Sequence, residues 1–198
     1  MTTQALPTPI DISAAVAWSQ RIRKVGGYIQ LAFATFWLLR GALILGGTAG
    51  PPITAVALVA VGAVLVYAMA VSAKRGTRPT SPEANRIERA VNLATVIELI
   101  ASFAFPVIVS AAGHSDWVLP SIAITIGPLL LWLDHLVQIR RYRPVGWALT
   151  IGPLLLVATL SGTALAATTG LTAGLLLLGT AALGFYDLAI LPPPANAR

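Results

Sequence analysis

The sequence predicts an all-α integral membrane protein with six transmembrane helices arranged as three helical hairpins. Of its 198 residues, 57% are hydrophobic and only 10% are charged, whereas about 25% of the residues of a soluble domain are charged. Most of the basic residues also lie in short segments between long apolar stretches. Too little chain remains for an extramembrane core, so we expect one transmembrane domain at residues 26–191.

Six apolar segments have the roughly 20 residues that a helix needs to cross a bilayer. A cytoplasmic tail at residues 1–25 precedes them and another follows at 192–198. In the first tail, segment 11–24 begins with Asp11, a favourable helix N-cap, and ends in basic residues. It is either a helix lying in the membrane interface or a cytoplasmic extension of the first span. The expected spans are about 26–47, 53–73, 90–112, 117–138, 146–166 and 171–191.

Basic residues alternate between the connections and predict the orientation. Loops 74–89 and 139–145 carry five and three Lys or Arg residues, whereas connections 48–52, 113–116 and 167–170 carry none. Counting the tails, twelve of the thirteen basic residues lie on one side. Because basic segments stay in the cytoplasm, we expect both termini to be cytoplasmic, in a plasma or bacterial inner membrane.

The three connections without basic residues would join the spans into three hairpins, whose return helices share a loose pattern. Gly127 precedes Trp132, and Gly179 precedes the aromatic pair of Phe185 and Tyr186. An Asp follows the aromatic residues in both helices, at Asp134 and at Asp187. One hairpin repeated three times would give such a pattern. Helices rich in Ala, Leu and Gly would also resemble one another by composition alone.

Ionisable side chains within the spans are the first candidates for a site, because each costs at least about 2.5–3.5 kcal/mol on insertion scales. Asp134, His135 and Asp187 lie near the basic segments, so ion pairs or interfacial water would explain them. The alternative is that Asp134 and Asp187 carry protons or donate them to a substrate.

Glu98 lies deeper in its span, where a short carboxylate side chain cannot reach water along the helix. It could pair with Arg40 and lock the first span to the third. Alternatively, it faces a cavity as a proton carrier or general acid, with Asn92, Gln30 and Tyr67 adding polar lining.

The heptapeptide TIGPLLL occurs twice, at residues 125–131 and 150–156. The two spans run in opposite directions, and both Gly-Pro pairs fall near the membrane midplane. A proline removes a backbone donor and kinks a helix, although the repeat could also arise by chance in helices of this composition. Kinks that open a cavity just outside the acids are predicted at Gly127, Pro128, Gly152 and Pro153.

Segment 118–152 combines a proline near a helix start, a mid-helix glycine, a basic turn and a tyrosine before the next helix's glycine. Pro120, Gly127, Tyr142 and Gly146 carry this pattern. It resembles a group of small, uncharacterised polytopic membrane proteins of high-GC bacteria. That group commonly has a histidine after the mid-helix glycine, where this chain has Pro128, so no role for that histidine is carried over. The resemblance implies no particular activity.

The composition also excludes several kinds of site. The absence of cysteine excludes disulfides and thiol chemistry, and the two histidines lie on different sides of the predicted spans. We therefore expect no metal and no other cofactor. The net charge of +6 is explained by the cytoplasmic segments, so nucleic acid is not an expected partner, whereas the lipid bilayer is.

Three functions stay open at this point. The first is transport or conduction of a small apolar or amphiphilic molecule, or an ion, through an inner-leaflet cavity lined by Glu98, Asp134 and Asp187. The second is a membrane-embedded enzyme that protonates an isoprenoid or lipid-like substrate and is similar to terpene cyclases only in general design. The third is a homo-oligomer or a subunit of a larger complex. Ligand contacts for the first two are expected at Arg40, Trp37, Tyr67, Asn92, Trp132, His135, Phe185 and Tyr186.

Overall fold

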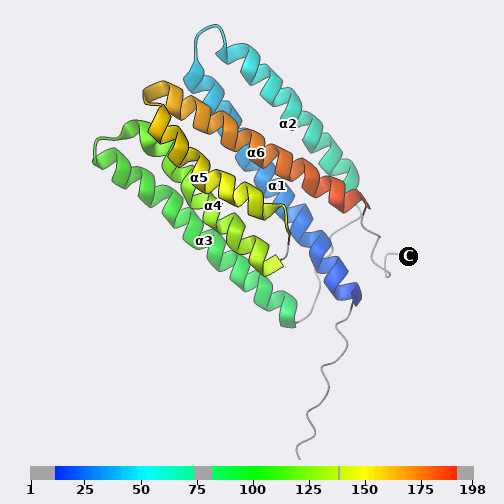
Figure 1. Cartoon of the computed structure of the whole chain (residues 1–198). Helices are drawn as coiled ribbons and strands as arrows, with labels where there is room; N and C mark the ends of the chain where they lie inside the picture. Colours follow the sequence, from blue (N-terminus) through cyan, green and yellow to red (C-terminus); the bar gives the residue numbers. More distant parts are fainter. Residues whose placement is uncertain (1–11, 74–81, 138, 191–198) are drawn as a thin grey trace, which may run out of the picture.

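The computed structural model describes residues 12–73, 82–137 and 139–190, which form six α-helices and one short 3-10 helix (Figure 1). The predicted all-α class is confirmed. In chain order the elements are α1 (Ile12–Leu45), α2 (Gly50–Ser72), α3 (Pro82–Ala111), η1 (Ser115–Trp117), α4 (Val118–Val137), α5 (Tyr142–Thr159) and α6 (Gly162–Ile190).

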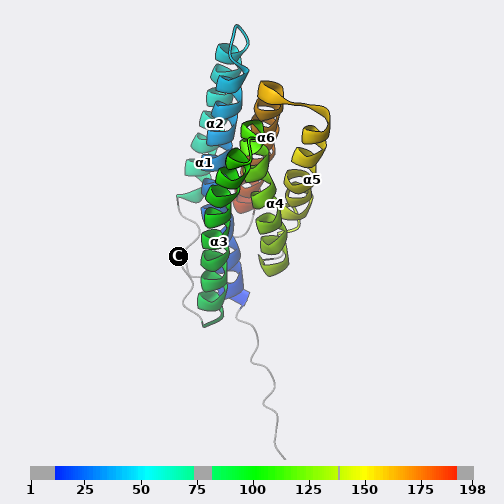
Figure 2. The same cartoon turned by 90° about the vertical axis from the view of Figure 1, so that its left-hand side faces the viewer.

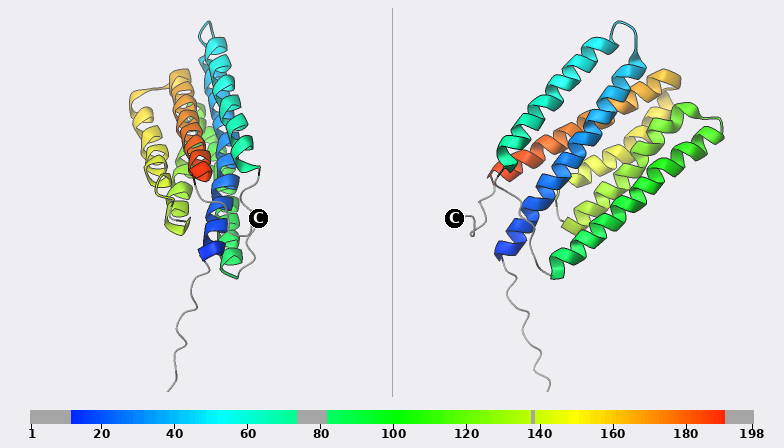
Figure 3. Two further views of the ribbon diagram at one scale, coloured as in Figure 1. Left: turned by 90° about the vertical axis from the view of Figure 1, so that its right-hand side faces the viewer. Right: turned by 180° about the vertical axis from the view of Figure 1, so that it is seen from behind.

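Five of the helices, α1, α2, α3, α4 and α6, are long and apolar enough to cross a membrane. The chain is therefore a multi-pass membrane protein in contact with a lipid bilayer. Helix α5 has 18 residues, which corresponds to a length of about 27 Å. Figures 1 and 3 show α2 at one edge of the bundle and α3 at the other, and Figure 2 shows α5 outside α4 and α6.

Basic residues gather at one end of the bundle. The ammonium group of Lys24, near the start of α1, donates to the carbonyl oxygen of Ser72 at the end of α2, 2.9 Å away. Arg141, just before α5, pairs with Asp187 near the end of α6. These described basic residues thus lie at one end of the bundle, and the cytoplasmic placement of this end stays a prediction.

Helices α1 and α6 share the most extensive contact of any helix pair in the described structure, and glycines make this possible. A Cβ atom on Gly170 would lie 2.8 Å from the Cα atom of Gly41, and one on Gly174 would lie 2.8 Å from the backbone nitrogen of Leu38. In lipid, helices associate through van der Waals packing and hydrogen bonds rather than through removal from water. Small residues therefore hold α1 against α6, and Trp37 and Phe185 fill the core beside them.

The break between the last two helices lies earlier in the chain than predicted. The sequence predicted spans at 146–166 and 171–191, but α5 ends at Thr159 and α6 begins at Gly162. Leu160 is extended, and Gly162 has a φ of 58°, a conformation that favours glycine. The backbone N–H of Gly162 donates to the Asp116 carboxylate at 3.2 Å. Segment 167–170, predicted as a loop, lies inside α6 because Gly170 packs on α1.

Two other predicted boundaries also shift. Helix α1 runs without a break from Ile12, which fits a cytoplasmic extension of the first span, while Asp11 lies outside the described residues. Helix α3 begins at Pro82, so part of the predicted loop 74–89 is helical; residues 74–81 and 191–198 are outside the described part of the chain. Helix α5 packs mainly against α4 rather than α6, and the arrangement as three repeated hairpins stays a prediction.

The two copies of TIGPLLL have different roles, and both helices continue through their prolines. A Cβ atom on Gly127 would lie 2.7 Å from the carbonyl oxygen of Gly146 and 2.8 Å from the backbone nitrogen of Thr150, so the first copy packs against the second copy's threonine. Gly152 has no such neighbour within 4 Å. It borders, with Pro153, a cavity between α5 and α6 whose lining contains no acid. The pair at Gly152 and Pro153 therefore does not border the acids, and the predicted kinks stay a prediction.

Candidate functional site

A cleft of about 240 Å³ lies between α1, α3 and α4, in the half of the bundle that carries the basic residues. Its walls are mainly apolar. Exposed side chains, including Val25, Ile29 and Leu99, line it, so the cleft opens sideways toward lipid. Its polar lining consists of Arg21, Gln30, Glu88, Asn92, Thr95, Glu98 and Tyr142.

Glu98 is the one residue of α3 that is buried, among those whose side chains the structure describes, with a relative exposure of 7%. Helix α3 packs mainly against α4, and its other faces carry exposed apolar side chains such as Leu93, Ile100 and Phe103. An apolar exterior suits a helix in lipid. The inward side of α3 therefore presents a carboxyl group to the cleft, which agrees with the predicted cavity-facing position.

Two hydroxyl groups connect Glu98 to α4. The Ser102 hydroxyl donates to Glu98 Oε1 at 2.9 Å, and it lies 2.9 Å from the Thr125 hydroxyl. The Thr125 hydroxyl in turn donates to the carbonyl oxygen of Ile122 at 2.7 Å. A chain of hydrogen-bonding groups thus runs from the buried carboxyl group across the α3–α4 contact.

Both helices contain a proline next to this chain of hydrogen-bonding groups. Pro106 lies inside α3 and Pro128 inside α4. Because a proline has no backbone N–H, the carbonyl groups four residues earlier, at Ser102 and Ile124, lack their helical donors. Backbone that is free of helical hydrogen bonds is tolerated at membrane depth where it is buried in protein or lines a cavity.

The predicted pair of Arg40 with Glu98 is not formed. Arg40 is exposed and borders a separate cavity with Phe36 and Ser115, at the opposite end of α1 from the basic cluster. Because α3 packs on α4 rather than on α1, the nearest polar partner of Glu98 is Ser102, which connects to α4. The carboxyl group therefore lacks a basic partner in the described part of the chain.

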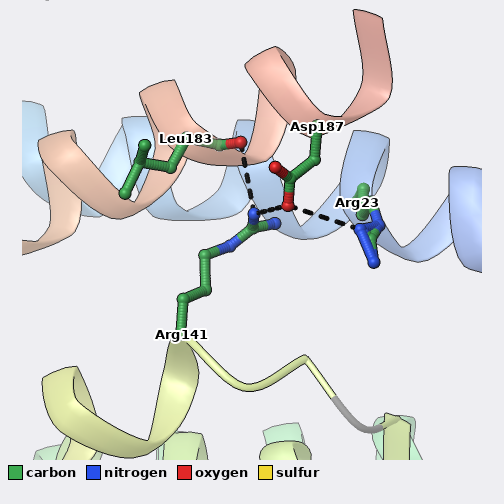
Figure 4. A network of polar contacts seen from close by, with 4 residues as sticks. All are labelled: Arg23, Arg141, Leu183 and Asp187. Atoms are coloured by element: carbon green, nitrogen blue, oxygen red, sulfur yellow. Dashed lines mark hydrogen bonds and ion pairs between the residues drawn. The ribbon is translucent and has the colours of Figure 1, made fainter. Parts of the chain in front are cut away.

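Asp187 lies in an ion cluster instead of the cleft (Figure 4). Its Oδ2 atom accepts hydrogen bonds from Arg141 and, at 3.5 Å, from Arg23. Arg141 also donates to the carbonyl oxygen of Leu183 at 3.2 Å. This carboxylate joins α1 and α6 to the turn before α5, so pairing with basic segments explains it without a catalytic role.

The other two candidates at this end, Asp134 and His135, also lie outside the cleft lining. Asp134 is half-buried near the end of α4, and it makes no hydrogen bond or ion pair with any residue that the structure describes. His135 is exposed. Neither side chain contributes to the surroundings of Glu98.

The aromatic residues predicted to contact a ligand are dispersed. Trp37 is fully buried beside Phe36, with 5.8 Å between ring centroids, and Phe185 packs edge-on against Tyr28. The other three, Tyr67, Trp132 and Tyr186, have relative exposures of 39–55%. In the described structure none of the five lines the cleft; they are Trp37, Tyr67, Trp132, Phe185 and Tyr186.

Asn92 and Gln30 do line the cleft, as predicted for the surroundings of Glu98, but sequence reasoning missed several neighbours. Gln30 lines the cleft together with the buried Tyr142. The missed α3 residues follow a pattern that was available in the sequence, a polar side chain every three or four residues on one helix face. That stripe comprises Glu88, Asn92, Thr95, Glu98 and Ser102.

No known protein family, curated protein or solved structure matches this chain. The resemblance over 118–152 therefore stays a prediction. Within the described residues, no three His, Cys, Asp or Glu side chains come together to hold a metal ion.

Proposed function

We propose that this protein transports a small apolar or amphiphilic molecule through the cleft, coupled to a proton carried by Glu98. The observation that carries the proposal is that a cleft open to lipid leads to a buried carboxyl group without a basic partner among the described residues. An ionisable side chain at membrane depth is costly and is ordinarily found where protons or substrates pass. Apolar walls would admit the ligand from the bilayer.

Counting protons supports the role of Glu98. Three short contacts connect Glu98, Ser102, Thr125 and the carbonyl oxygen of Ile122. Each contact needs one proton, and the two hydroxyl groups supply two. A protonated Glu98 would supply the third by donating to Ser102 in place of accepting from it, which would leave the Ser102 proton for Thr125. Loss of that proton would leave one contact without a donor. Proton exchange at Glu98 would thus alter the connection between α3 and α4.

A second cavity supports transport rather than binding alone. It lies between α1, α4 and α6 at the opposite end, and its lining includes Phe36, Arg40 and Ile122. Phe33 and Ile126, about one helical turn away from these residues, line the cleft itself. Both cavities therefore lie along the space between α1 and α4.

The enzyme hypothesis has less support. Its aromatic pocket depends on side chains such as Trp132 and Phe185, which lie away from Glu98. Asp187, its other acid, is paired with two arginines. Transport is therefore the function that the geometry supports best.

The test uses proteoliposomes that contain an internal pH dye. Three probes of similar shape are added separately: tetraphenylphosphonium, tetraphenylborate and the neutral triphenylphosphine oxide. We expect at least one to change the internal pH, and we expect Glu98→Gln to abolish that change. The matched control Asp134→Asn alters a carboxyl group outside the cleft and should keep the wild-type response. A normal response from Glu98→Gln, or no response to any probe, would refute the proposal.

A further inference from the structure

The charged groups that line the cleft carry an excess of negative charge when Glu98 is ionised. Arg21 and Glu88 lie near the mouth of the cleft, at the basic end of the bundle, and Glu98 lies deepest. Arg21 is the one basic side chain among the lining residues that the structure describes. The deep part of the cleft therefore holds a carboxyl group without a neighbouring positive charge.

The walls around this carboxyl group are apolar and partly aromatic. Ile29 and Leu99 line the open side, and the rings of Phe33 and Tyr142 also border the cleft. Aromatic faces attract cations, most strongly where water is excluded. The cleft therefore offers apolar contact, aromatic rings and one deep negative charge to a ligand that enters from lipid.

An inorganic cation fits this site poorly. Calcium and magnesium take six or more oxygen ligands, whereas the hydrogen-bonding neighbour of Glu98 is the Ser102 hydroxyl. The described residues contain no cluster of acids and histidines that could replace a hydration shell. A cation whose charge is spread over an apolar body needs no such shell and could use the walls as well as the carboxylate.

We propose that the ligand of the cleft is a lipophilic organic cation, which exchanges with the proton of Glu98. This inference rests on the proposed function and adds the chemical class of the substrate. One proton leaves the carboxyl group as one cation binds, so the two ligands compete. The other titratable groups facing the cleft are Arg21 from α1, Glu88 from α3 and Tyr142 from α5; the α4 wall is apolar.

The test compares two ions of nearly identical shape and opposite charge in calorimetric titrations of the protein in lipid nanodiscs. Tetraphenylphosphonium should bind at least about tenfold more tightly than tetraphenylborate. Glu98→Gln should remove this preference, and Asp134→Asn should keep it. Competition with one proton should raise the affinity for the cation by up to about tenfold per pH unit.

Equal affinities for the two ions, or tighter binding of the borate, would overturn the inference. The proposed transport would survive that result if the neutral probe still changed the internal pH in a Glu98-dependent way. Should Glu98→Gln fail to fold, carbodiimide labelling of the unchanged protein replaces it. Tetraphenylphosphonium should then protect Glu98 from the reagent and tetraphenylborate should not; the reverse result, or protection by neither, would overturn the inference.

Discussion

The repeated heptapeptide provides a matched pair of substitutions. Gly127→Ala and Gly152→Ala make the same change in the same local sequence, TIGPLLL. At Gly127 the new methyl group would lie 2.7 Å from the Gly146 carbonyl oxygen and 2.8 Å from the Thr150 nitrogen. Both neighbours are backbone atoms, so a side-chain rotation cannot relieve the contact. At Gly152 no neighbour lies within 4 Å.

The magnitude follows from the distances. Ordinary contacts involving carbon lie at about 3.5–4.0 Å, so α4 and α5 must separate by roughly 1 Å to admit the Gly127→Ala methyl group. Overpacking of this kind costs about 1–3 kcal/mol, which lowers the melting temperature by roughly 2–12 °C in a chain of this size. Gly152→Ala should change the free energy of unfolding by less than about 0.5 kcal/mol.

Thermal unfolding of the two variants in one detergent, followed by tryptophan fluorescence, measures the difference. The double variant Gly127→Ala/Gly146→Ala should lose less than the sum of the single variants, because the first substitution already separates the helices. Equal melting temperatures for Gly127→Ala and Gly152→Ala would refute the close α4–α5 contact at Gly127.

Three further predictions concern other contacts. Gly170→Ala should destabilise by about 1–3 kcal/mol because its methyl group would meet Gly41, whereas Gly179→Ala on the same helix has open space; equal melting temperatures would contradict the α1–α6 packing. Asp187→Asn leaves two arginines without their shared carboxylate and should cost about 1–2 kcal/mol, a value reduced for its partial exposure, whereas Asp134→Asn should be nearly neutral in the same melting experiment. Dicyclohexylcarbodiimide should label Glu98 from lipid, as read by mass spectrometry, and labelling confined to Asp134 would contradict the access route.

Composition and charge pattern were sufficient to predict the class of the protein and its one-sided basic residues. They were not sufficient to locate the last helix break. Gly162 and Gly170 both lie in apolar, small-residue sequence, and only the packing of Gly170 on Gly41 distinguishes a contact glycine from a turn glycine. Such a contact joins residues far apart in the chain, which local pattern cannot reveal.

The candidate site was predictable only in part. The depth of Glu98 and the polar stripe on α3 can be found from helical spacing. The hydrogen-bonding partner of Glu98 cannot be found from helical spacing, because it depends on α3 packing against α4 rather than α1. The sequence could therefore offer Arg40 as one possible partner of Glu98, whereas the contact of Ser102 with Thr125 joins two helices and has no local sequence signal.

The limited packing of α3 has a practical consequence for work on the purified protein. Among the described residues, one buried side chain and one main neighbour hold this helix, while lipid surrounds the rest of its surface. Detergent that replaces lipid would therefore weaken the attachment of α3 before it disturbs the glycine-packed α1–α6 pair. Lipid nanodiscs are the safer setting for ligand screening, because loss of α3 would remove one wall of the cleft while the remaining helices still gave a normal helical spectrum.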